Sequence, residues 1–318
     1  MTIVVTGSAG HLGEALMRTL RTEGRPALGL DLKPSPFTDR VGSICDPKFV
    51  AECLDGARAV LHCVTLHKPH VATHSNGDFL KANVSGTLVL LEAAQAAGLE
   101  AFVFTSTTSV FGSALTPAAG EPAAWITERV TPIPKNIYGA TKQAAETLCE
   151  LFAHQRGLPV VVLRTARFFP EADDDPRVSA AYELANVQAN ELLNRRVDIE
   201  DVVSAHRCAV ERAPKLGFAR YIVSATTPFS PADASLLRQD AAAATRRLFA
   251  DCDAIYAARG WRLFPHIDRV YDNRAARAEL GWRPRHDFRH ALDCLAEGRD
   301  FRSALAIAVG AKGYHGAA

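Results

Sequence analysis

The sequence predicts a doubly wound α/β fold on a parallel β-sheet, with a smaller, discontinuous α/β part toward the C-terminus. Short β-rich runs alternate with longer helical patterns over the first two thirds of the 318 residues. The β-rich runs are continuously apolar rather than alternating, which is typical of parallel strands covered by helices on both faces. A glycine-rich turn also joins the first strand to the first helix. These three observations together favour a dinucleotide-binding type of sheet.

The expected elements follow one another in order along the chain. Strands are expected at 3–6, 26–32, 57–64, 100–106 and 159–166. Helices are expected between them at 11–23, from 47 onward, at 78–97 and at 137–156. Asp46 and Pro47 mark the second helix, because aspartate is favoured at the N-cap and proline at the first helical position. Beyond Ala166 the pattern is less regular, with helices expected near 182–194, 199–212, 231–258 and 287–297.

Composition and net charge argue against several classes of protein. The net charge of +1 and the pI near 7.7 give no electrostatic reason to expect nucleic acid or an anionic membrane as partner. No apolar stretch reaches the roughly 18 to 20 residues that span a bilayer. We interpret the opening MTIVVTG as a strand rather than a signal peptide. The seven cysteines are scattered and form no CxxC, so we expect reduced thiols in a cytoplasmic protein.

The turn after the first strand reads TGSAGHLG, with glycines at Gly7, Gly10 and Gly13. Glycine allows the tight turn and lets a pyrophosphate approach the backbone at the N-terminus of the helix. Asp31 ends the second strand, where a carboxylate can accept hydrogen bonds from an adenosine ribose and repels a 2′-phosphate. The pattern favours NAD over NADP, although Lys33 weakens this preference. The alternative is a plain turn followed by a solvated aspartate.

The segment NIYGATK places Tyr138 and Lys142 four residues apart, on one face of the expected helix. A tyrosine is a poor base at its free pKa of about 10. A neighbouring ammonium and a cationic nicotinamide ring would stabilise the phenolate and lower that pKa. The pair could then take a proton from a secondary alcohol. Taken alone the spacing is common and usually structural, and the glycine motif on the same chain makes the catalytic interpretation the leading one.

With these motifs the chain resembles the extended short-chain dehydrogenase/reductase family, the group that contains nucleotide-sugar epimerases and dehydratases. The resemblance runs over nearly the whole chain. It rests on TGSAGHLG, ANVSGTLVLLEAA (82–94), FTSTTSVFG (104–112), YGATK, DIEDVVSAH (198–206) and YDNRAARAELGWRPRHDF (271–288). It implies a Rossmann-type fold, NAD as the cofactor and a sugar-like substrate. It also implies a homodimer that pairs the helices at 78–97 and 137–156.

The resemblance further implies roles for individual residues. Tyr138 would be the acid/base, Lys142 would bind the nicotinamide ribose, and Thr107 would hydrogen-bond the reacting oxygen. The implied cofactor contacts, besides Tyr138 and Lys142, are Gly7, Gly10, His11, Leu12, Gly13, Asp31, Ser43, Ile44, Cys63, Asn83 and Thr105. The implied substrate contacts are Thr107, Thr108, Arg167, His67 and Lys68.

Within the hydroxyl run, Thr105 and Ser106 are expected nearer the strand and the cofactor. Thr108 and Ser109 are expected mainly to satisfy backbone groups in the turn. Many family members carry Asp-Glu where this chain has Thr108 and Ser109. The absence of carboxylates there argues against elimination of water. Ser43 likewise replaces an aspartate that contacts adenine in the family, although the Ile44 backbone can still contribute.

Two further departures concern the substrate. Asn194 stands where the family usually has an arginine that binds a nucleotide diphosphate, with Arg195 and Arg196 adjacent. Arg167 stands where nucleotide-sugar enzymes often carry an asparagine. A guanidinium there suggests a carboxylate or phosphate on the substrate, because its fork matches such groups in two-point geometry. The alternative is an ion pair with Glu171 or with the loop at 173–175.

The loop HCVTLHKPHVATH (62–74) is rich in histidine. His67, His70 and His74 have helical spacing, but Pro69 interrupts it and no acid or cysteine completes a ligand set. We therefore expect no metal there and interpret the loop as lining the substrate. His67 or Lys68 would supply the contact, since ligands bind at the carboxyl ends of such strands.

The expected domains are a dinucleotide-binding domain at 1–165, to which 197–226 returns, and a substrate-binding domain at 166–196 and 227–318. The leading function is an NAD-dependent oxidoreductase of nucleotide-sugar epimerase type, in which the keto intermediate is reduced again on its other face. The alternative is a net dehydrogenase of a small sugar or sugar acid, favoured by Arg167 and by the short segment after it. A non-catalytic NAD-binding regulator is the third hypothesis, and it is disfavoured because the catalytic residues are present.

Overall fold

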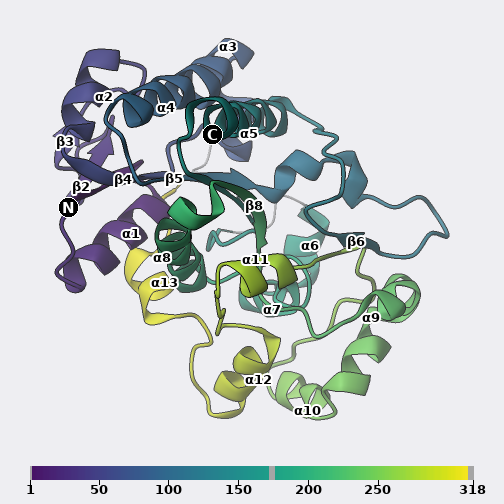
Figure 1. The fold of residues 1–318 in the computed structure, drawn as a ribbon. Helices are drawn as coiled ribbons and strands as arrows, with labels where there is room; N and C mark the ends of the chain where they lie inside the picture. Colours follow the sequence, from purple (N-terminus) through teal and green to yellow (C-terminus); the bar gives the residue numbers. More distant parts are fainter. Residues whose placement is uncertain (1, 172–175, 314–318) are drawn as a thin grey trace.

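The computed structural model describes residues 2–171 and 176–313. A seven-stranded parallel sheet in the order β3-β2-β1-β4-β5-β7-β8 lies between two layers of helices (Figure 1). Its strands are β1 (Thr2–Thr6), β2 (Ala27–Asp31), β3 (Arg40–Val41), β4 (Ala57–His62), β5 (Ala101–Thr107), β7 (Val160–Thr165) and β8 (Phe218–Val223). A second sheet pairs β6 (Ala124–Ile126) with β9 (Arg269–Tyr271). The predicted doubly wound α/β fold is confirmed.

Helices connect the strands of the large sheet and form most of the chain after β8. The α-helices are α1 (His11–Thr22), α2 (Pro47–Leu54), α3 (Asn76–Phe79), α4 (Gly86–Ala96), α5 (Ile137–Arg156), α6 (Pro176–Ala181), α7 (Leu184–Glu191), α8 (Ile199–Leu216), α9 (Ala234–Leu248), α10 (Cys252–Ala257), α11 (Arg274–Glu279), α12 (Phe288–Ala296) and α13 (Ala304–Val309). Shorter helical turns are η1 (Lys68–Ala72), η2 (Leu80–Ser85), η3 (Thr108–Phe111), η4 (Ser113–Leu115) and η5 (Pro231–Asp233). Among the described residues, no helix has the length and apolar character to cross a membrane.

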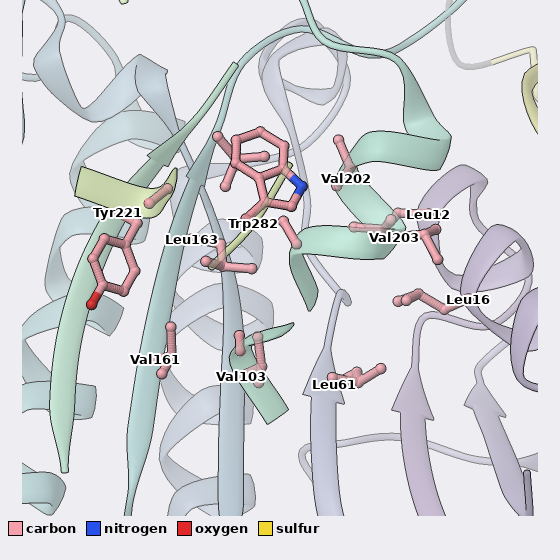
Figure 2. Close-up of a cluster of buried hydrophobic side chains, with 14 of the residues drawn as sticks. Leu12, Leu16, Leu61, Val103, Val161, Leu163, Val202, Val203, Tyr221 and Trp282 are labelled. Atoms are coloured by element: carbon pink, nitrogen blue, oxygen red, sulfur yellow. The ribbon is translucent and has the colours of Figure 1, made fainter. Parts of the chain in front are cut away.

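The large sheet is buried on both faces. Alternate residues of β7 show this, because Val161 and Leu163 pack on one face with α1 and α8 (Figure 2), whereas Val160 and Val162 pack on the other face with α2, α4 and α5. Such two-sided burial requires a continuously apolar strand. It also leaves the carboxyl ends of the strands as the edge at which polar side chains gather.

Two predicted helices are interrupted. The helix expected at 231–258 divides into η5, α9 and α10, and Asp240 within α9 has non-helical angles of φ −155° and ψ 83°. On an unbroken helix Leu237 and Tyr256 would point about 100° apart. The breaks allow both side chains to enter one apolar cluster, which belongs to the part of the chain that carries α9, α10 and α12. The helix expected at 78–97 contains the π-helical turn η2.

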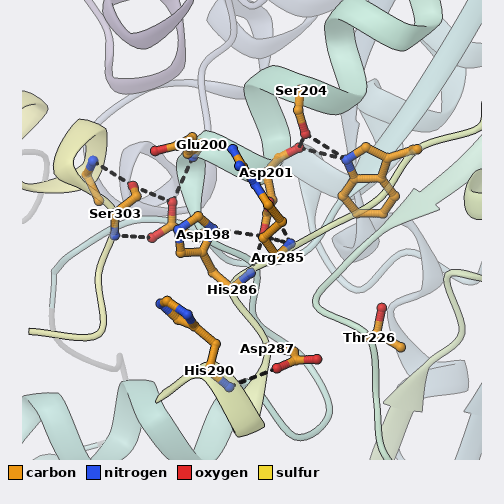
Figure 3. A network of polar contacts seen from close by, with 12 residues as sticks. Asp198, Glu200, Asp201, Ser204, Thr226, Arg285, His286, Asp287, His290 and Ser303 are labelled. Carbon is orange, nitrogen blue, oxygen red and sulfur yellow. Dashed lines mark hydrogen bonds and ion pairs between the residues drawn. The ribbon is translucent and has the colours of Figure 1, made fainter. Parts of the chain in front are cut away.

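The C-terminal part is fastened to the start of α8 (Figure 3). The Asp201 carboxylate accepts hydrogen bonds from the backbone N–H groups of Arg285 at 3.0 Å and His286 at 2.9 Å. The Trp282 indole donates to the Asp201 carbonyl at 3.0 Å. α8 packs against the large sheet and β8 is its edge strand, and both belong to the part of the chain expected to return to the first domain. The exact domain boundaries stay a prediction.

Candidate active site

Tyr138, Lys142 and Thr107 come together at the carboxyl end of the sheet. Thr107 is the last residue of β5, and Tyr138 and Lys142 lie in the first two turns of α5. The helix begins there because the Asn136 side chain accepts the Gly139 N–H at 2.9 Å. A hydrogen bond joins the side chains of Thr107 and Tyr138. All three predicted catalytic side chains are buried.

Burial affects the protonation of Tyr138. Burial raises the pKa of Tyr138 to about 12, and the hydrogen bond with Thr107 only partly opposes this rise. The lowered pKa expected from the sequence depends on a neighbouring ammonium and a bound nicotinamide ring, and it stays a prediction. The Lys142 ammonium donates instead to the Thr105 carbonyl at 2.7 Å and lies 3.9 Å from the centroid of the Phe104 ring. Lys142 is thus directed toward β5.

Burial also acts on Lys142 itself. It lowers the pKa of the Lys142 ammonium to about 8, while Cys149, Glu146 and Cys63 oppose the shift. The charged form is therefore held only up to mildly alkaline pH. An ammonium that is poorly solvated in this way interacts strongly with any partner that reaches it.

The three hydroxyl side chains at the end of β5 have different hydrogen-bond partners. The Thr105 hydroxyl lies 2.8 Å from the His206 Nε2 atom and 3.4 Å from the Cys63 sulfur. The Ser106 hydroxyl donates to the Glu146 carboxylate at 2.5 Å. The Thr107 hydroxyl accepts the Ser109 N–H at 3.1 Å and so caps η3. Thr105 and Ser106 both lie in β5 as expected, and the Ser106 side chain faces α5.

The glycine turn has the geometry of a close backbone approach. Gly7 has a φ of +77°, which favours glycine. A Cβ atom on Gly13 would lie 1.9 Å from the Gly7 carbonyl oxygen, so only glycine fits. Gly10 is the N-cap of α1 and offers no side-chain cap to the first helical turn, which contains His11 and Leu12. An anion such as a pyrophosphate fits this uncapped helix N-terminus.

Asp31 is held beside this turn at the end of β2. One carboxylate oxygen accepts the Ala9 N–H at 3.1 Å and the other accepts the Lys33 N–H at 2.9 Å. Farther along the same edge, the Ser43 hydroxyl accepts the Cys45 N–H at 3.1 Å. Ile44 packs against Gly86, where a Cβ atom would lie 2.6 Å from the Ile44 side chain. These positions fit an extended dinucleotide that follows the carboxyl edge.

Asn83 connects the loop after β4 to α5. Its amide oxygen accepts the Leu66 N–H at 2.8 Å, and its amide nitrogen donates to the Leu66 carbonyl at 2.9 Å and to the Thr141 hydroxyl at 3.1 Å. Asn83 therefore orders the edge of the site through backbone groups. Burial raises the pKa of the neighbouring Cys63 thiol to about 12, so this thiol is not a nucleophile.

The histidine-rich loop packs through its rings. The His67 ring centroid lies 4.4 Å from that of His70 and 5.4 Å from that of Phe169, whereas Lys68 is exposed. Across residues 2–171 and 176–313, no group of three histidine, cysteine or acidic residues is placed to hold a metal. The contact between His67 and Phe169 places the loop beside the segment that follows β7.

Arg167 opens that segment. Its Nη2 atom donates to the backbone carbonyl of Glu171 at 3.1 Å. The Glu171 carboxylate lies instead 3.5 Å from the His11 Nε2 atom. The loop at 173–175, the other expected partner, lies outside the described residues. Arg195 and Arg196 both pair with the buried Glu191 carboxylate, at 2.7 and 2.8 Å.

Arg167, Arg195 and Arg196 all act on the Glu191 carboxylate. Burial would raise the pKa of Glu191, but the positive charges of Arg195, Arg196 and Arg167 outweigh it and lower that pKa. Asn194 is structural, since its amide donates to the Arg269 carbonyl at 2.8 Å.

Sequence reasoning did not find Glu146 and Arg164, although both adjoin the predicted site. Glu146 follows Lys142 by one helical turn, as Lys142 follows Tyr138. A carboxylate on the buried face of a helix needs a charged or polar partner. That spacing could have indicated Glu146, but nothing in the sequence indicates which strand supplies the partner.

Comparison with known proteins identifies the family to which the chain is similar. Residues 3–217 match the model of the NAD dependent epimerase/dehydratase family. A UDP-glucose 4-epimerase of Rhizobium leguminosarum bv. trifolii is 33% identical over 172 residues, which is 51% of this chain and 50% of that protein. An L-arabinose 1-dehydrogenase (NAD(P)(+)) of Haloferax volcanii is 29% identical over 176 residues, covering 51% of this chain and 65% of that protein. The chain spans about half the length of the curated relatives it matches.

Among solved structures, a short-chain dehydrogenase/reductase superfamily protein from Agrobacterium tumefaciens, with bound NAD, superposes with a TM-score of 0.66. It is 24% identical, and the match covers 93% of this chain and 96% of that one. At this identity the likeness concerns the fold.

Proposed function

Since the chain belongs to the NAD-dependent epimerase/dehydratase family, we propose that it is an NAD-dependent oxidoreductase that acts on a secondary alcohol of a sugar-like substrate, of nucleotide-sugar epimerase type. The observation that carries the proposal is the meeting of Thr107, Tyr138 and Lys142 at the carboxyl end of the sheet. An alcohol placed beside Thr107 and Tyr138 would have a hydrogen-bond donor and a proton acceptor at one oxygen.

The cofactor would lie along the edge from α1 to α5. Its pyrophosphate would face the first turn of α1 at Gly10, His11 and Leu12, and its adenosine ribose would face Asp31. The carboxylate at Asp31 supports NAD rather than NADP. When bound, NAD would supply the acceptor for the hydride that leaves the reacting carbon.

The proton transfer depends on residues of this chain. Tyr138 must lose its proton before it can take one from the alcohol, so its pKa must fall from about 12. Lys142, one turn away on the same helix face, is the cation that would lower it once its ammonium turns from the Thr105 carbonyl toward the site. Thr107 would hold the alcohol oxygen. Tyr138 would return the proton when the ketone is reduced.

The second candidate is a net dehydrogenase of a small sugar or sugar acid. The supporting observation is the arginine cluster after β7, where Arg167, Arg195 and Arg196 lie close enough to Glu191 to lower its pKa. Guanidinium groups near the reacting carbon suit a substrate that carries a carboxylate or phosphate. Water elimination is disfavoured in either case, because Thr108 and Ser109 stand where an acid/base pair of carboxylates would be needed.

A homodimer through α4, η2 and α5 is part of the proposal. Leu80 on η2 and Leu151 on α5 are each 51% exposed, and the small residues Ala140 and Ala144 of α5 are exposed as well. α4 and α5 lie side by side (Figure 1). Sedimentation should show a dimer that Leu151→Glu dissociates, and a wild-type monomer at micromolar concentration would contradict this part.

We also propose a cytoplasmic setting and a small-molecule substrate as the partner. All seven cysteines are free thiols, which suits a reducing compartment. The near-neutral charge gives no basis for proposing nucleic acid or an anionic membrane surface.

Incubation with NAD and a panel of UDP-sugars, free sugars and sugar acids tests the function. Formation of an isomer without NADH, detected by NMR, would establish epimerase activity. Accumulation of NADH, measured at 340 nm, would establish dehydrogenase activity. Tyr138→Phe is the matched control. A protein that binds NADH but converts no member of the panel, with Tyr138→Phe indistinguishable from wild type, would favour a non-catalytic regulator.

A further inference from the structure

A buried ionic network lies one helical turn beyond Lys142. Glu146 and Arg164 are each 2% exposed. The Glu146 carboxylate accepts hydrogen bonds from Arg164 Nη2 at 2.7 Å, from Arg164 Nε at 3.1 Å and from the Ser106 hydroxyl at 2.5 Å. Arg220, on the next strand, places its Nε atom 3.2 Å from the same carboxylate. Three neighbouring strands therefore converge on one side chain of α5.

The network joins the two elements that carry the proposed catalytic residues. Ser106 directly precedes Thr107 on β5, and Ser106 is paired with Arg164 across the sheet. Arg164 also places its guanidinium 4.9 Å from the centroid of the Phe111 ring, in the turn that follows Thr107. Arg164 thus contacts α5 through Glu146, and it contacts the chain before Thr107 in β5 and after Thr107 in η3.

We propose that Glu146 and Arg164 are positioning residues that fix the Tyr138–Lys142 turns of α5 against the end of β5. This inference rests on the proposed function of Tyr138 and Lys142, neither of which touches the pair directly through a hydrogen bond. A guanidinium that donates from two nitrogens to one carboxylate fixes both the distance and the relative orientation of the two side chains. An apolar contact leaves both free.

Stability alone does not account for such a pair. Two buried charges lose their hydration, and apolar side chains of similar volume often serve stability equally well or better. An ionic pair is instead well suited to hold one register of a helix on a sheet. Removal of one partner leaves the other buried and uncompensated, so each singly substituted protein should lose the alignment of α5 with β5 and bind NADH more weakly.

Glu146 also sets the charge balance around Lys142. The titratable groups that face Lys142 are Glu146 and Cys149 on its own helix, with Cys63 and His62 from the β4 side. Burial raises the pKa of both thiols and lowers that of His62, so these three are uncharged at neutral pH. Among the four, Glu146 is the one that forms an ion pair, with Arg164 at 2.7 Å, and its carboxylate supports the ammonium form of Lys142.

The test compares Glu146→Gln, Arg164→Met and the double variant with Glu150→Gln. Glu150 is the matched control, because it lies one turn farther along α5 and binds Arg220, but its side chain is 44% exposed. The first readout is the titration of Lys142 by ¹³C NMR of labelled lysine, with the signal assigned through Lys142→Arg. The second is the NADH dissociation constant from fluorescence, and the third is the melting temperature.

We expect Glu146→Gln to move the Lys142 titration to lower pH and to weaken NADH binding at pH 8 about tenfold, the size of one charge-assisted hydrogen bond. In NADH binding the double variant should be about as impaired as either single one, since the partners act as a unit. Glu150→Gln should match wild type. Ser106→Ala, which keeps the ion pair, should shift both readouts in the same direction by less and covers the case in which Glu146→Gln does not fold.

Lowered melting temperatures with an unchanged Lys142 titration and unchanged NADH affinity would overturn the inference and leave a structural ion pair. Additive effects on NADH binding in the double variant would also contradict it. The proposed function fails by a different observation, namely a wild-type protein that binds no NADH. In that case the Lys142 titration would still decide whether Glu146 and Arg164 act on the end of α5.

Discussion

The junction of β5 with α5 and the segment that follows β7 differ in how they are held together. At the junction, Thr107, Tyr138 and Lys142 are fixed by hydrogen bonds between neighbouring elements, and the residue types follow the family pattern. After β7, Arg167 bonds a backbone carbonyl, and Arg195 and Arg196 share the Glu191 carboxylate, with residue types that depart from that pattern. The difference suggests that the junction sets the reaction and the later segment sets the substrate.

The largest effect is expected at the junction. Lys142→Met should lower turnover at least about 10²-fold, because the acid/base step loses the cation that supports the phenolate. NADH binding should weaken as well. The melting temperature should not fall, since burial of the ammonium opposes its charge. Steady-state kinetics and calorimetry check this, and full turnover would separate Lys142 from the chemistry.

Thr107→Val tests the same junction with a side chain of nearly the same shape. Loss of the hydroxyl should lower turnover about 10²-fold, the usual effect of removing one donor to a reacting oxygen. Ser109→Ala is the control, because Ser109 contributes its backbone N–H to the Thr107 hydroxyl. A Thr107→Val protein with wild-type kcat would contradict the assignment of Thr107 as the group that hydrogen-bonds the reacting oxygen.

A moderate and selective effect is expected after β7. Arg167→Met should raise KM about tenfold for a substrate with a carboxylate or phosphate near the reacting carbon. Substrates without such a group should keep their KM. Arg167→Lys should be intermediate, because an ammonium lacks the two-point fork. An equal loss for charged and neutral substrates would mean that Arg167 only braces its own loop.

The smallest effect should come from the C-terminal segment that is bound to the start of α8 (Figure 3). Burial alone would lower the pKa of His286, but the hydrogen bond to Asp201 and the charges of Asp198 and Glu200 outweigh it, so the pKa is raised. A raised pKa stabilises the fold fully below the ordinary value of 6.5, and this contribution disappears as pH rises through the raised value. His286→Gln should therefore lose stability in urea at pH 5.5 and much less at pH 9. Equal losses at both pH values would contradict the account.

The junction could largely be predicted from the sequence because its signals are local. Tyr138 and Lys142 are one helical turn apart, and the glycine turn and Asp31 lie in consecutive elements. The effect of burial on the Tyr138 pKa could not be predicted, because burial is a property of the packed structure. The Glu146–Arg164 pair was missed for the same reason, since its partners belong to a helix and a strand that meet only in three dimensions.

The prediction was weakest where helix and strand patterns are weak. The edge strand β8 carries Arg220 among its apolar residues and was not identified as a strand. The break at Asp240 within α9 and the break between α9 and α10 serve tertiary packing and have no glycine or proline signal. The arginine cluster was anticipated only in part, because Arg167 was singled out but Glu191 was not.

Tyr138→Phe removes the hydroxyl group to which the proton transfer is assigned. Turnover of wild type and Tyr138→Phe should be measured on the best substrate from the panel, together with the NADH dissociation constant of each. We expect the variant to lose activity by about 10² to 10⁴-fold, the range of general acid/base catalysis, and to bind NADH within twofold of wild type. A variant with wild-type turnover would contradict the assignment of the reaction to the junction of β5 and α5.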